Sequence, residues 1–358
     1  MAFTNDEMNA VMNYVLNYHI KGDALAQTIQ DKPLLKAMKA RMKTFPGGKG
    51  KIDGPVKGEF LNSNGAFFKG FKYDDTVTFQ NPRAVLRPSY DWCQIHGGIT
   101  VTFTELMQGG IKVTDTNNGS GTSNFSDAEK VQLTNLLDEK VMDLTESWSR
   151  KMNEALWNDG TQDDGKQFPG ITAYIQGSNT GLTTGGLARN TYAWWRNRAV
   201  TGMNTATSQI ISSTLRSEIR QLRRYGGKPT LWLAGSKFLE ALEKEITEKS
   251  TIFVTNGNQS GARKIGNYSI ELPGIGTIEY DPTLDDLGTI KGDSVDYSKR
   301  LYAIDVDQGF QLWAVDGEAE RIHTPGRPEN KMAMYRSLTF AGGTAAFRLN
   351  GQGVYSIA

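Results

Sequence analysis

The feature that most constrains the fold is one long amphipathic helix, predicted over 126–158. It begins with a capping box, Ser126-Asp127-Ala128-Glu129, whose hydroxyl and carboxylate can satisfy the backbone amides left free at a helix start. Apolar residues then recur every three or four positions, at Leu133, Leu137, Val141, Leu144, Trp148, Met152 and Ala155. At 1.5 Å per residue the helix would be roughly 48 Å long, far above the average of about 11–12 residues. Such a helix needs a long sheet or several neighbouring elements to cover its apolar face.

The segment 1–46 reads as a detached helical arm. Two apolar sets recur at helical spacing, Met8, Met12, Val15, Leu16 and Ile20, and then Leu34, Leu35, Met38 and Met42. Pro46, followed by two glycines, ends the second helix. Seven basic residues and no acidic one lie between Lys32 and Lys51. This charge fits either a solvated helix face or an arm that lies against other subunits or against a polyanion.

The segment 47–98 has the character of a long extended loop. Glycine-rich polar stretches such as Asn62-Ser63-Asn64-Gly65 separate aromatic and β-branched residues, and Asn81-Pro82 and Arg87-Pro88 interrupt the chain. Neither helical spacing nor a buried face is visible, and extended segments of this kind usually pack on something outside their own domain. Strict alternation over Ile99–Thr104 then predicts a half-buried strand.

A separate α/β unit is predicted after Gly165. Its expected elements are a helix over 208–225, a buried strand at 231–234, a helix from Ser236 through Ile246, a hairpin over 268–280, and a strand pair formed by 300–305 and 310–315. The first of these helices carries Ile211, Leu215, Ile219 and Leu222 on one face. The C-terminal run from Met332 to Ile357 is rich in strand-forming residues.

The chain offers little for catalysis or metal binding. Lys plus Arg number 40 and Asp plus Glu number 39, so the net charge of +1 lacks the basic excess of a dedicated nucleic-acid binder. The single cysteine, Cys93, excludes an intramolecular disulfide and a cysteine-based metal site, and it reads as a packed thiol rather than as the nucleophile of a dyad with His96. His19 and His323 stand alone. We therefore predict no catalytic residue, cofactor or metal.

The sequence also gives no sign of a membrane. The first residues lack the basic region of a signal peptide, and no apolar run reaches the length of a membrane span. The use of one cysteine fits a reducing cytoplasm. We expect no membrane partner.

The most distinctive short stretch is Tyr192-Ala193-Trp194-Trp195-Arg196-Asn197-Arg198. It could stack a base or a sugar ring on its aromatic faces. The alternative, which we favour, is a structural role in which the tryptophans bury the edge of a subdomain and the arginines form salt bridges or stack on them.

The order of these elements resembles the major capsid proteins of tailed bacteriophages. A helical arm, an extended loop, one very long helix, an α/β unit and a strand-rich tail follow one another over nearly the whole chain. Two short phrases are similar as well: Gly186-Leu187-Ala188-Arg189 followed by Trp194-Trp195-Arg196-Asn197, and a helix, Gly226-Gly227-Lys228-Pro229, a tryptophan-containing strand and a further helix from Ser236.

The resemblance implies an α+β capsid fold with a defined division of the chain. The arm would be 1–46 and the extended β-hairpin loop 47–98. The peripheral domain would combine 99–165, with its spine helix at 126–158, and 318–358. The axial α/β domain would be 166–317, and the C-terminal strands would return to the peripheral domain.

The resemblance also implies a function and a set of partners. The protein would assemble with itself, as pentamers and hexamers, into an icosahedral shell around double-stranded DNA, in the host cytoplasm and then in the virion. Because the spine helix starts near residue 126, no cleavable scaffolding segment of about a hundred residues precedes it, which implies a separate scaffolding protein or none. A portal and a decoration protein are further expected partners. The candidate contacts to other subunits or to DNA are Lys36, Lys39, Arg41, Lys43, Lys49, Lys51, Arg216, Arg220, Arg223 and Arg224.

Two other functions remain open from the sequence. An encapsulin-like compartment would share the fold and would enclose a protein cargo instead of DNA. A cytoplasmic hydrolase acting through Asp and His residues would instead be a small soluble oligomer. Particle size separates the hydrolase from the two shells, and the enclosed material separates the shells from each other.

Overall fold

The computed structural model describes residues 30–48, 50–58, 60, 70–77, 79, 85–108, 127–205, 210–249, 269–272, 274–326 and 333–358. The predicted helix around Met8–Ile20, the capping residue Ser126 and the candidate contact Lys49 lie outside these ranges. Residues Lys32–Ala358 form one compact unit, and the description below concerns that unit.

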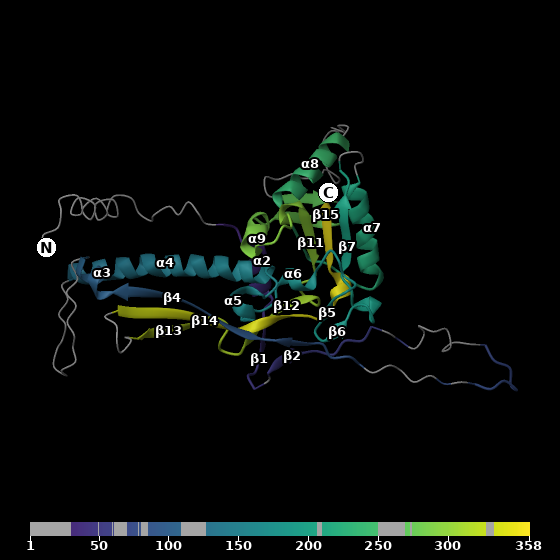
Figure 1. Cartoon of the computed structure of the whole chain (residues 1–358), viewed down its shortest axis with the longest axis horizontal. Coiled ribbons are helices and arrows are strands. Elements are labelled where there is room, and N and C mark those ends of the chain that lie inside the picture. Colours follow the sequence, from purple (N-terminus) through teal and green to yellow (C-terminus); the bar gives the residue numbers. More distant parts are fainter. Residues whose placement is uncertain are drawn as a thin grey trace, which may run out of the picture. The chain divides into compact units, whose positions relative to one another are not determined.

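The long helix is confirmed as α4, Asp127–Trp157, with 31 residues. Trp148, Met152 and Ala155, three of the residues predicted on its apolar face, are buried. Figure 1 shows α4 running alongside strand β4, Cys93–Thr102. The two elements approach closely at Gly97, where a Cβ atom would lie 2.9 Å from the Trp148 ring. A long sheet therefore covers the helix, as its length requires.

That sheet has five strands. Its order is β1 (Lys43–Phe45), β12 (Phe310–Val315), β14 (Ala333–Ala346) and β13 (Arg321–Gly326), and β4 also pairs with β14. Strand β4 pairs antiparallel with β14 from Thr102 opposite Ala333 to Cys93 opposite Gly342. The predicted alternation over 99–104 is thus part of a longer strand, which ends at Thr102 where helix α3, Phe103–Gln108, begins.

The second sheet has six strands. Its order is β7 (Arg198–Met203), β15 (Gly353–Ile357), β11 (Arg300–Ile304), β8 (Leu231–Ala234), β10 (Gly276–Tyr280) and β9 (Ser269–Leu272). Helices α7 (Ile211–Arg224) and α8 (Ser236–Lys249) share a hydrophobic cluster with one face of this sheet. Helix α9 (Thr283–Lys291) and the end of α4 share a second cluster with the other face. The predicted helices, the strand at 231–234 and the hairpin are confirmed, and the four apolar residues predicted on the face of α7 are all buried.

Alternation along the strands produces these two faces. In β8 the side chains of Trp232 and Ala234 join the cluster of α7 and α8, whereas Leu233 joins the cluster of α9. Tyr302 of β11 likewise lies on the α9 side, between neighbours that face α7 and α8. Successive side chains of a strand point to opposite faces, so a sheet covered on both sides needs apolar residues at every position.

Two expectations about strand partners are wrong. We expected 300–305 and 310–315 to pair, but β11 and β12 lie in different sheets. The turn between them is held by Asp305, whose carboxylate accepts hydrogen bonds from the amides of Asp307 and Gln308, both at 3.1 Å. The buried Gln352 side chain bonds the backbone of Asp305 as well, so tertiary contacts direct the chain from one sheet to the other.

The C-terminal strands also separate. Strand β14 lies in the five-stranded sheet, as expected for a return to the peripheral domain, but β15 lies in the six-stranded sheet between β7 and β11. The 3-10 helix η4, Leu349–Gly351, lies between β14 and β15. Nothing in the local sequence marks this change of sheet, because both strands have similar composition.

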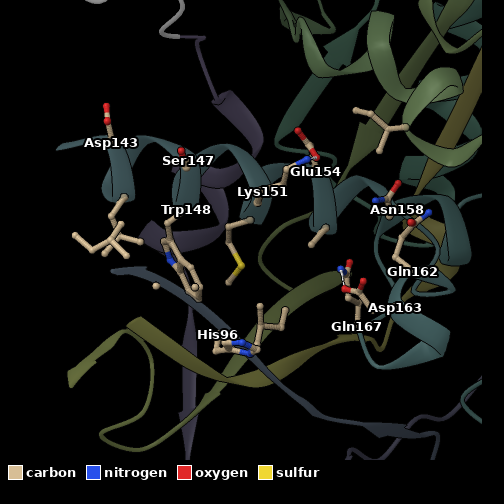
Figure 2. A pocket seen from close by; sticks show the side chains of 18 residues that line it. His96, Asp143, Ser147, Trp148, Lys151, Glu154, Asn158, Gln162, Asp163 and Gln167 are labelled. Carbon is tan, nitrogen blue, oxygen red and sulfur yellow. Dashed lines mark hydrogen bonds and ion pairs between the residues drawn. The ribbon is translucent and has the colours of Figure 1, made fainter. Parts of the chain in front are cut away.

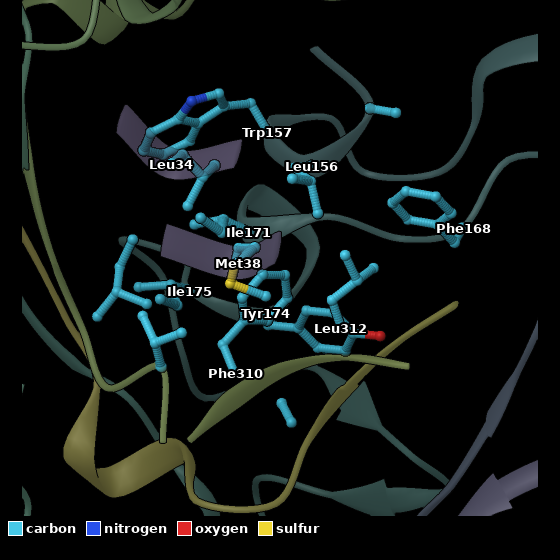
Figure 3. Close-up of a cluster of buried hydrophobic side chains, with 14 of the residues drawn as sticks. Leu34, Met38, Leu156, Trp157, Phe168, Ile171, Tyr174, Ile175, Phe310 and Leu312 are labelled. Atoms are coloured by element: carbon cyan, nitrogen blue, oxygen red, sulfur yellow. The ribbon is translucent and has the colours of Figure 1, made fainter. Parts of the chain in front are cut away.

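The second helix of the expected arm is not detached. Helix α2, Pro33–Ala40, buries Leu34, Leu35 and Met38. Figure 3 shows Leu34 and Met38 in one cluster with Leu156 and Trp157 of α4. Polar contacts reinforce the packing, since Lys32 forms an ion pair with Glu146 at 2.6 Å and the amide of Leu35 donates to Asn153 Oδ1 at 3.1 Å. The helix is amphipathic because its apolar face is part of the main core.

Candidate assembly surfaces

The two ends of the expected extended loop pair with each other. Strand β2, Lys51–Asp53, is antiparallel to β3, Ser89–Asp91. Beyond it, Val56 and Leu86 exchange two backbone hydrogen bonds of 2.7 and 3.0 Å. The described ends of the loop therefore run antiparallel to each other, as the strands of a hairpin would.

Several large aromatic side chains on this loop are exposed to solvent. Phe60 is 72% exposed, Phe71 65% and Phe79 93%, and Tyr73 is fully exposed. Large apolar side chains gathered on one exposed segment mark an interaction surface, whereas single exposed apolar residues are ordinary. The loop is thus a candidate contact surface for another protein.

The base of the loop is anchored to the rest of the chain. The buried Tyr90 hydroxyl donates to the carbonyl of Ala346, and the amide of Ser89 donates to the carbonyl of Gly185 at 3.1 Å. Gly58 lies against the Trp194 ring so closely that a Cβ atom would fall 1.8 Å from it. These contacts fix the direction in which the loop leaves the core.

A buried arginine organises the neighbouring segment. Arg189 is fully buried, and its guanidinium donates to Thr184 Oγ1, to Asn197 Oδ1 at 2.8 Å and to the carbonyl of Tyr174 at 2.6 Å. Burial lowers the pKa of Arg189 to about 10, so it remains charged at neutral pH. Neutral oxygens accept its hydrogen bonds, so Arg189 acts as a hub that joins three other points of the chain, at Tyr174, Thr184 and Asn197.

The structural interpretation of the tryptophan-rich stretch is confirmed. Trp195 is buried, and its indole N–H donates to the carbonyl of Thr184 at 3.1 Å. Arg196 donates to the carbonyl of Arg189 at 2.6 Å. Arg198 makes two hydrogen bonds of 2.8 Å to the carboxylate of Glu218 on α7. The stretch therefore locks β7 to α7 and to the Arg189 hub.

Most of the predicted contact residues around α2 have partners within the chain. Lys39 pairs with Glu320, Arg41 pairs with Asp307, and Lys51 pairs with Asp91 at 3.2 Å. Lys43 lies over the Trp313 ring at 5.4 Å. Lys36 is exposed and has no ion pair among the residues that the structure describes.

The four arginines predicted on the second helix of the α/β unit are arranged differently. Arg216, Arg220, Arg223 and Arg224 are all exposed on α7, on the side opposite its buried residues. Within the described ranges none of them forms an ion pair, and Arg224 stacks on Tyr225 at 5.5 Å. They place four positive charges on the exposed side of α7.

A groove of about 690 Å³ lies between α4 and β4. Figure 2 shows Trp148 of α4 directed toward His96 of β4, while Asn158, Gln162 and Asp163 line the other end. Asn158 is buried and its Oδ1 atom has no hydrogen-bond partner. The groove is thus apolar at one end and polar at the other.

The described side chains give little support for acid–base or metal chemistry. Burial raises the pKa of the Cys93 thiol, with a smaller contribution from Asp91, which disfavours a reactive thiolate. His323 shares a hydrogen bond of 2.8 Å with Thr339 on the neighbouring strand. In the described part of the chain no three His, Cys, Asp or Glu side chains are placed to hold a metal ion. No helix there is long and apolar enough to cross a membrane.

The comparisons with known proteins rest on structure alone. No family model matches the sequence, and no curated protein matches it either. The capsid asymmetric unit of cyanophage A-1(L) is similar, with a TM-score of 0.60 and 13% identity over 93% of this chain and 95% of that one. The mature capsid of bacteriophage PhiM1 gives a TM-score of 0.54 and 8% identity over 94% and 90% of the two chains. The capsid of Myoviridae phage XM1 gives 0.52 and 12% over 95% and 96%.

Two compact sheets, a long helix beside one of them and a loop whose described ends are paired thus belong to a chain whose fold matches these shells over more than nine-tenths of its length. The chain has the α+β fold of the phage major capsid proteins over nearly its whole length.

Proposed function

We propose that this chain is the major capsid protein of a tailed bacteriophage and that it assembles with itself into an icosahedral shell enclosing double-stranded DNA. The observation that carries the proposal is the capsid fold, which extends over 93% of the chain. The match extends over 95% of the capsid chain as well, so it concerns the whole fold and not one shared subdomain.

The exposed side chains of the extended loop support assembly. Burying an aromatic side chain contributes about 1.5–3 kcal/mol, and a lone chain leaves Phe71, Tyr73 and Phe79 in water. A closed shell would bury them repeatedly against neighbouring copies. Contacts of modest strength, repeated at every subunit, suffice for a stable particle.

The finer parts of the proposal concern organisation and partners. Pentamers and hexamers of this chain would form the shell in the host cytoplasm, and the virion would be its final location. A separate scaffolding protein and a portal would take part in assembly, and a decoration protein could bind outside. The near-balanced charge of 40 basic and 39 acidic residues would leave most DNA charge to counterions.

The test is an assembly assay on the purified full chain, read by sedimentation and by nuclease protection of enclosed nucleic acid. We expect fast-sedimenting particles that protect DNA when they are made with the phage packaging components. Particles that enclose a protein cargo and never DNA would instead indicate an encapsulin-like compartment. A small oligomer with hydrolase activity and no particles would overturn the proposal.

A matched pair of variants tests the loop. Tyr73→Ser removes a fully exposed aromatic ring, whereas Asp74→Asn changes its exposed neighbour and keeps the apolar surface. We expect Tyr73→Ser to raise the concentration needed for assembly by about tenfold or more, because its ring is a buried anchor in the shell. Asp74→Asn should assemble like the wild type. Equal assembly of both variants would show that this ring contributes nothing to the contact between subunits.

A further inference from the structure

One flank of the six-stranded sheet carries a stripe of positive charge. Arg216, Arg220 and Arg224 are spaced by four residues along α7, Arg223 lies beside them, and Lys228 follows the helix. All five are exposed, and no ion pair to them exists in the described part of the chain. Like charges four residues apart repel each other and destabilise a helix. An anionic partner would remove this repulsion, which the isolated chain retains. We name these five residues the basic flank.

The opposite flank carries negative charge. Glu271 of β9 and Glu279 of β10 are exposed, and their neighbours Ile270 and Ile278 belong to the cluster of α7 and α8. Alternation along each strand therefore places both glutamates on the other face, which is the face of α9. Asp285 and Asp286 are exposed in the first turn of α9. We name Glu271, Glu279, Asp285 and Asp286 the acidic flank.

The acidic flank forms no ion pair among the described residues, although Lys237, which pairs with Asp296, also interacts electrostatically with Asp285. Asp285 accepts hydrogen bonds from the Ser236 amide at 3.0 Å and from the Tyr280 hydroxyl at 2.6 Å, which are both neutral donors. Among the described residues no Lys, Arg or His lies within ion-pair distance of any of the four carboxylates. Figure 1 shows α7 and α9 on opposite sides of this sheet. One chain thus presents two unpaired surfaces of opposite sign.

We propose that the basic flank of one copy binds the acidic flank of a second copy, head to tail, so that repeated contacts close a ring of axial domains. This inference rests on the proposed shell function and names the surfaces that meet within one pentamer or hexamer. A contact between two different surfaces of identical chains closes into a ring when the rotation between copies allows it. Two different surfaces on opposite faces of one sheet allow such a head-to-tail contact, and the closed shell supplies the requirement that it form a ring.

A small cavity on the basic flank supports an acidic occupant. It measures about 300 Å³ and is lined by Arg223, Lys228, Trp232 and Ile275 among others. Trp232 is only 2% exposed, and its indole N–H has no hydrogen-bond acceptor. A buried N–H without an acceptor is uncommon in folded proteins. The cavity thus offers two cations to a carboxylate of a partner, with the unsatisfied indole N–H of Trp232 in one of its lining residues.

A second copy accounts for more of the surface than DNA does. DNA would neutralise the basic flank but would leave the acidic flank unpaired and would be repelled by it. A second copy pairs both flanks at once, five cations against four carboxylates. It also agrees with the balance of 40 basic and 39 acidic residues in the whole chain.

Charge reversal on each flank gives a sharp test. The first variant carries Arg220→Glu with Arg223→Glu, and the second carries Glu271→Lys with Glu279→Lys. None of these four side chains makes a hydrogen bond or ion pair within the described part of the chain, so each variant should fold. Lys166→Glu, at an exposed position outside both flanks, is the matched control.

We expect either reversed variant alone to need at least about tenfold more protein for assembly, because each contact then loses most of its charge complementarity and sets like charges together at the reversed positions. The control should assemble like the wild type. In a chain carrying all four reversals, the reversed residues of the two flanks again face opposite charges, so this chain should regain assembly. A mixture of the two reversed variants should form rings of alternating copies, which close with six members and not with five.

Three results would overturn the inference. In the first, the reversed variants assemble like the wild type. In the second, the fourfold variant and the mixture both fail to assemble, although circular dichroism shows that the chains are folded. In the third, reversal of the basic flank abolishes DNA retention and leaves assembly intact. A wild-type chain that never assembles would overturn the proposed function, and this inference with it. Normal assembly of the wild type and of all variants would overturn the inference alone.

Discussion

At the scale of single residues, the buried polar groups carry the most specific information. Arg189 joins Thr184, Asn197 and the carbonyl of Tyr174 at the point where the extended loop leaves the core. A buried arginine held only by neutral oxygens is costly to desolvate, so its retention implies that its hydrogen bonds are nearly complete. The segment around the loop base should therefore depend on this one side chain.

Replacing Arg189 tests this dependence. Arg189→Met keeps much of the volume but leaves Thr184, Asn197 and the Tyr174 carbonyl without their donor. We expect the free energy of unfolding to fall by about 3 kcal/mol, measured by urea denaturation of unassembled chain. Arg189→Lys should recover little of it, because an ammonium cannot reproduce the planar geometry. If Arg189→Met lowers the free energy of unfolding by less than about 1 kcal/mol, the segment does not depend on Arg189 as proposed.

Asp281 gives a pH dependence with a defined sign. It is fully buried, and burial raises its pKa from 3.8 to about 6, although it accepts hydrogen bonds from the Trp157 indole at 2.9 Å and from the Thr283 amide at 3.0 Å. The folded state therefore holds the proton of Asp281 more tightly than the unfolded state does. The resulting contribution to the free energy of unfolding is fully present below pH 3.8 and is lost as the pH rises through about 6.

The measurement compares wild type with Asp281→Asn, which is neutral at every pH. Its single amide oxygen can replace only one of the two acceptor atoms, so the variant should be less stable by an amount that does not change with pH. Between pH 7 and pH 4 the stability of the wild type should improve relative to the variant by about 2–3 kcal/mol. The comparison cancels the carboxylates that respond in the opposite direction, such as Asp159 and Asp296, whose pKa values are lowered. Parallel profiles of stability against pH for the two proteins would show that Asp281 does not cause the pH dependence.

At the scale of elements, helix α2 is the clearest departure from the sequence prediction. It was expected in a detached arm, and it instead places Leu34 and Met38 in the main core beside α4. The spacing of its apolar residues predicted a helix with one apolar face. The spacing alone does not determine what covers that face. A neighbouring subunit or the spine helix of the same chain could bury the same apolar residues.

A pair of substitutions on α2 tests its place in the core. Met38 is 1% exposed, whereas Lys36 is exposed and has no ion pair among the described residues. We expect Met38→Ala to lower the free energy of unfolding of the unassembled chain by about 2–5 kcal/mol, through lost burial and the cavity it leaves. Lys36→Ala should stay within about 0.5 kcal/mol of the wild type. If both substitutions are neutral in the monomer, α2 does not belong to its core.

Other elements show where prediction succeeds and where it stops. The helices α4, α7 and α8 and the strand β8 follow from apolar spacing, because their faces are buried within the chain itself. The partners of β12 and β15 do not follow, because contacts of Asp305 and Gln352, distant in sequence, decide which sheet each strand joins. The basic stripe of α7 was visible as four arginines, but its acidic counterpart became visible only once β9, β10 and α9 were placed on one face.

At the scale of the whole molecule, the isolated chain leaves apolar and charged surfaces without partners. Exposed rings on the loop and two unpaired flanks of opposite charge occur on a chain with two well-buried hydrophobic clusters. A stable core combined with an uncovered apolar loop is expected of a subunit that completes its contacts in an assembly. The capsid fold supplies the geometry in which each loop and flank would meet a neighbour.

The central claim, assembly into a shell, is tested most directly by electron microscopy of the purified full chain across a range of concentrations, with and without a scaffolding protein. The account predicts closed icosahedral particles of uniform size, with the extended loop of each subunit lying on a neighbour. A monodisperse monomer or small oligomer under every condition would contradict it.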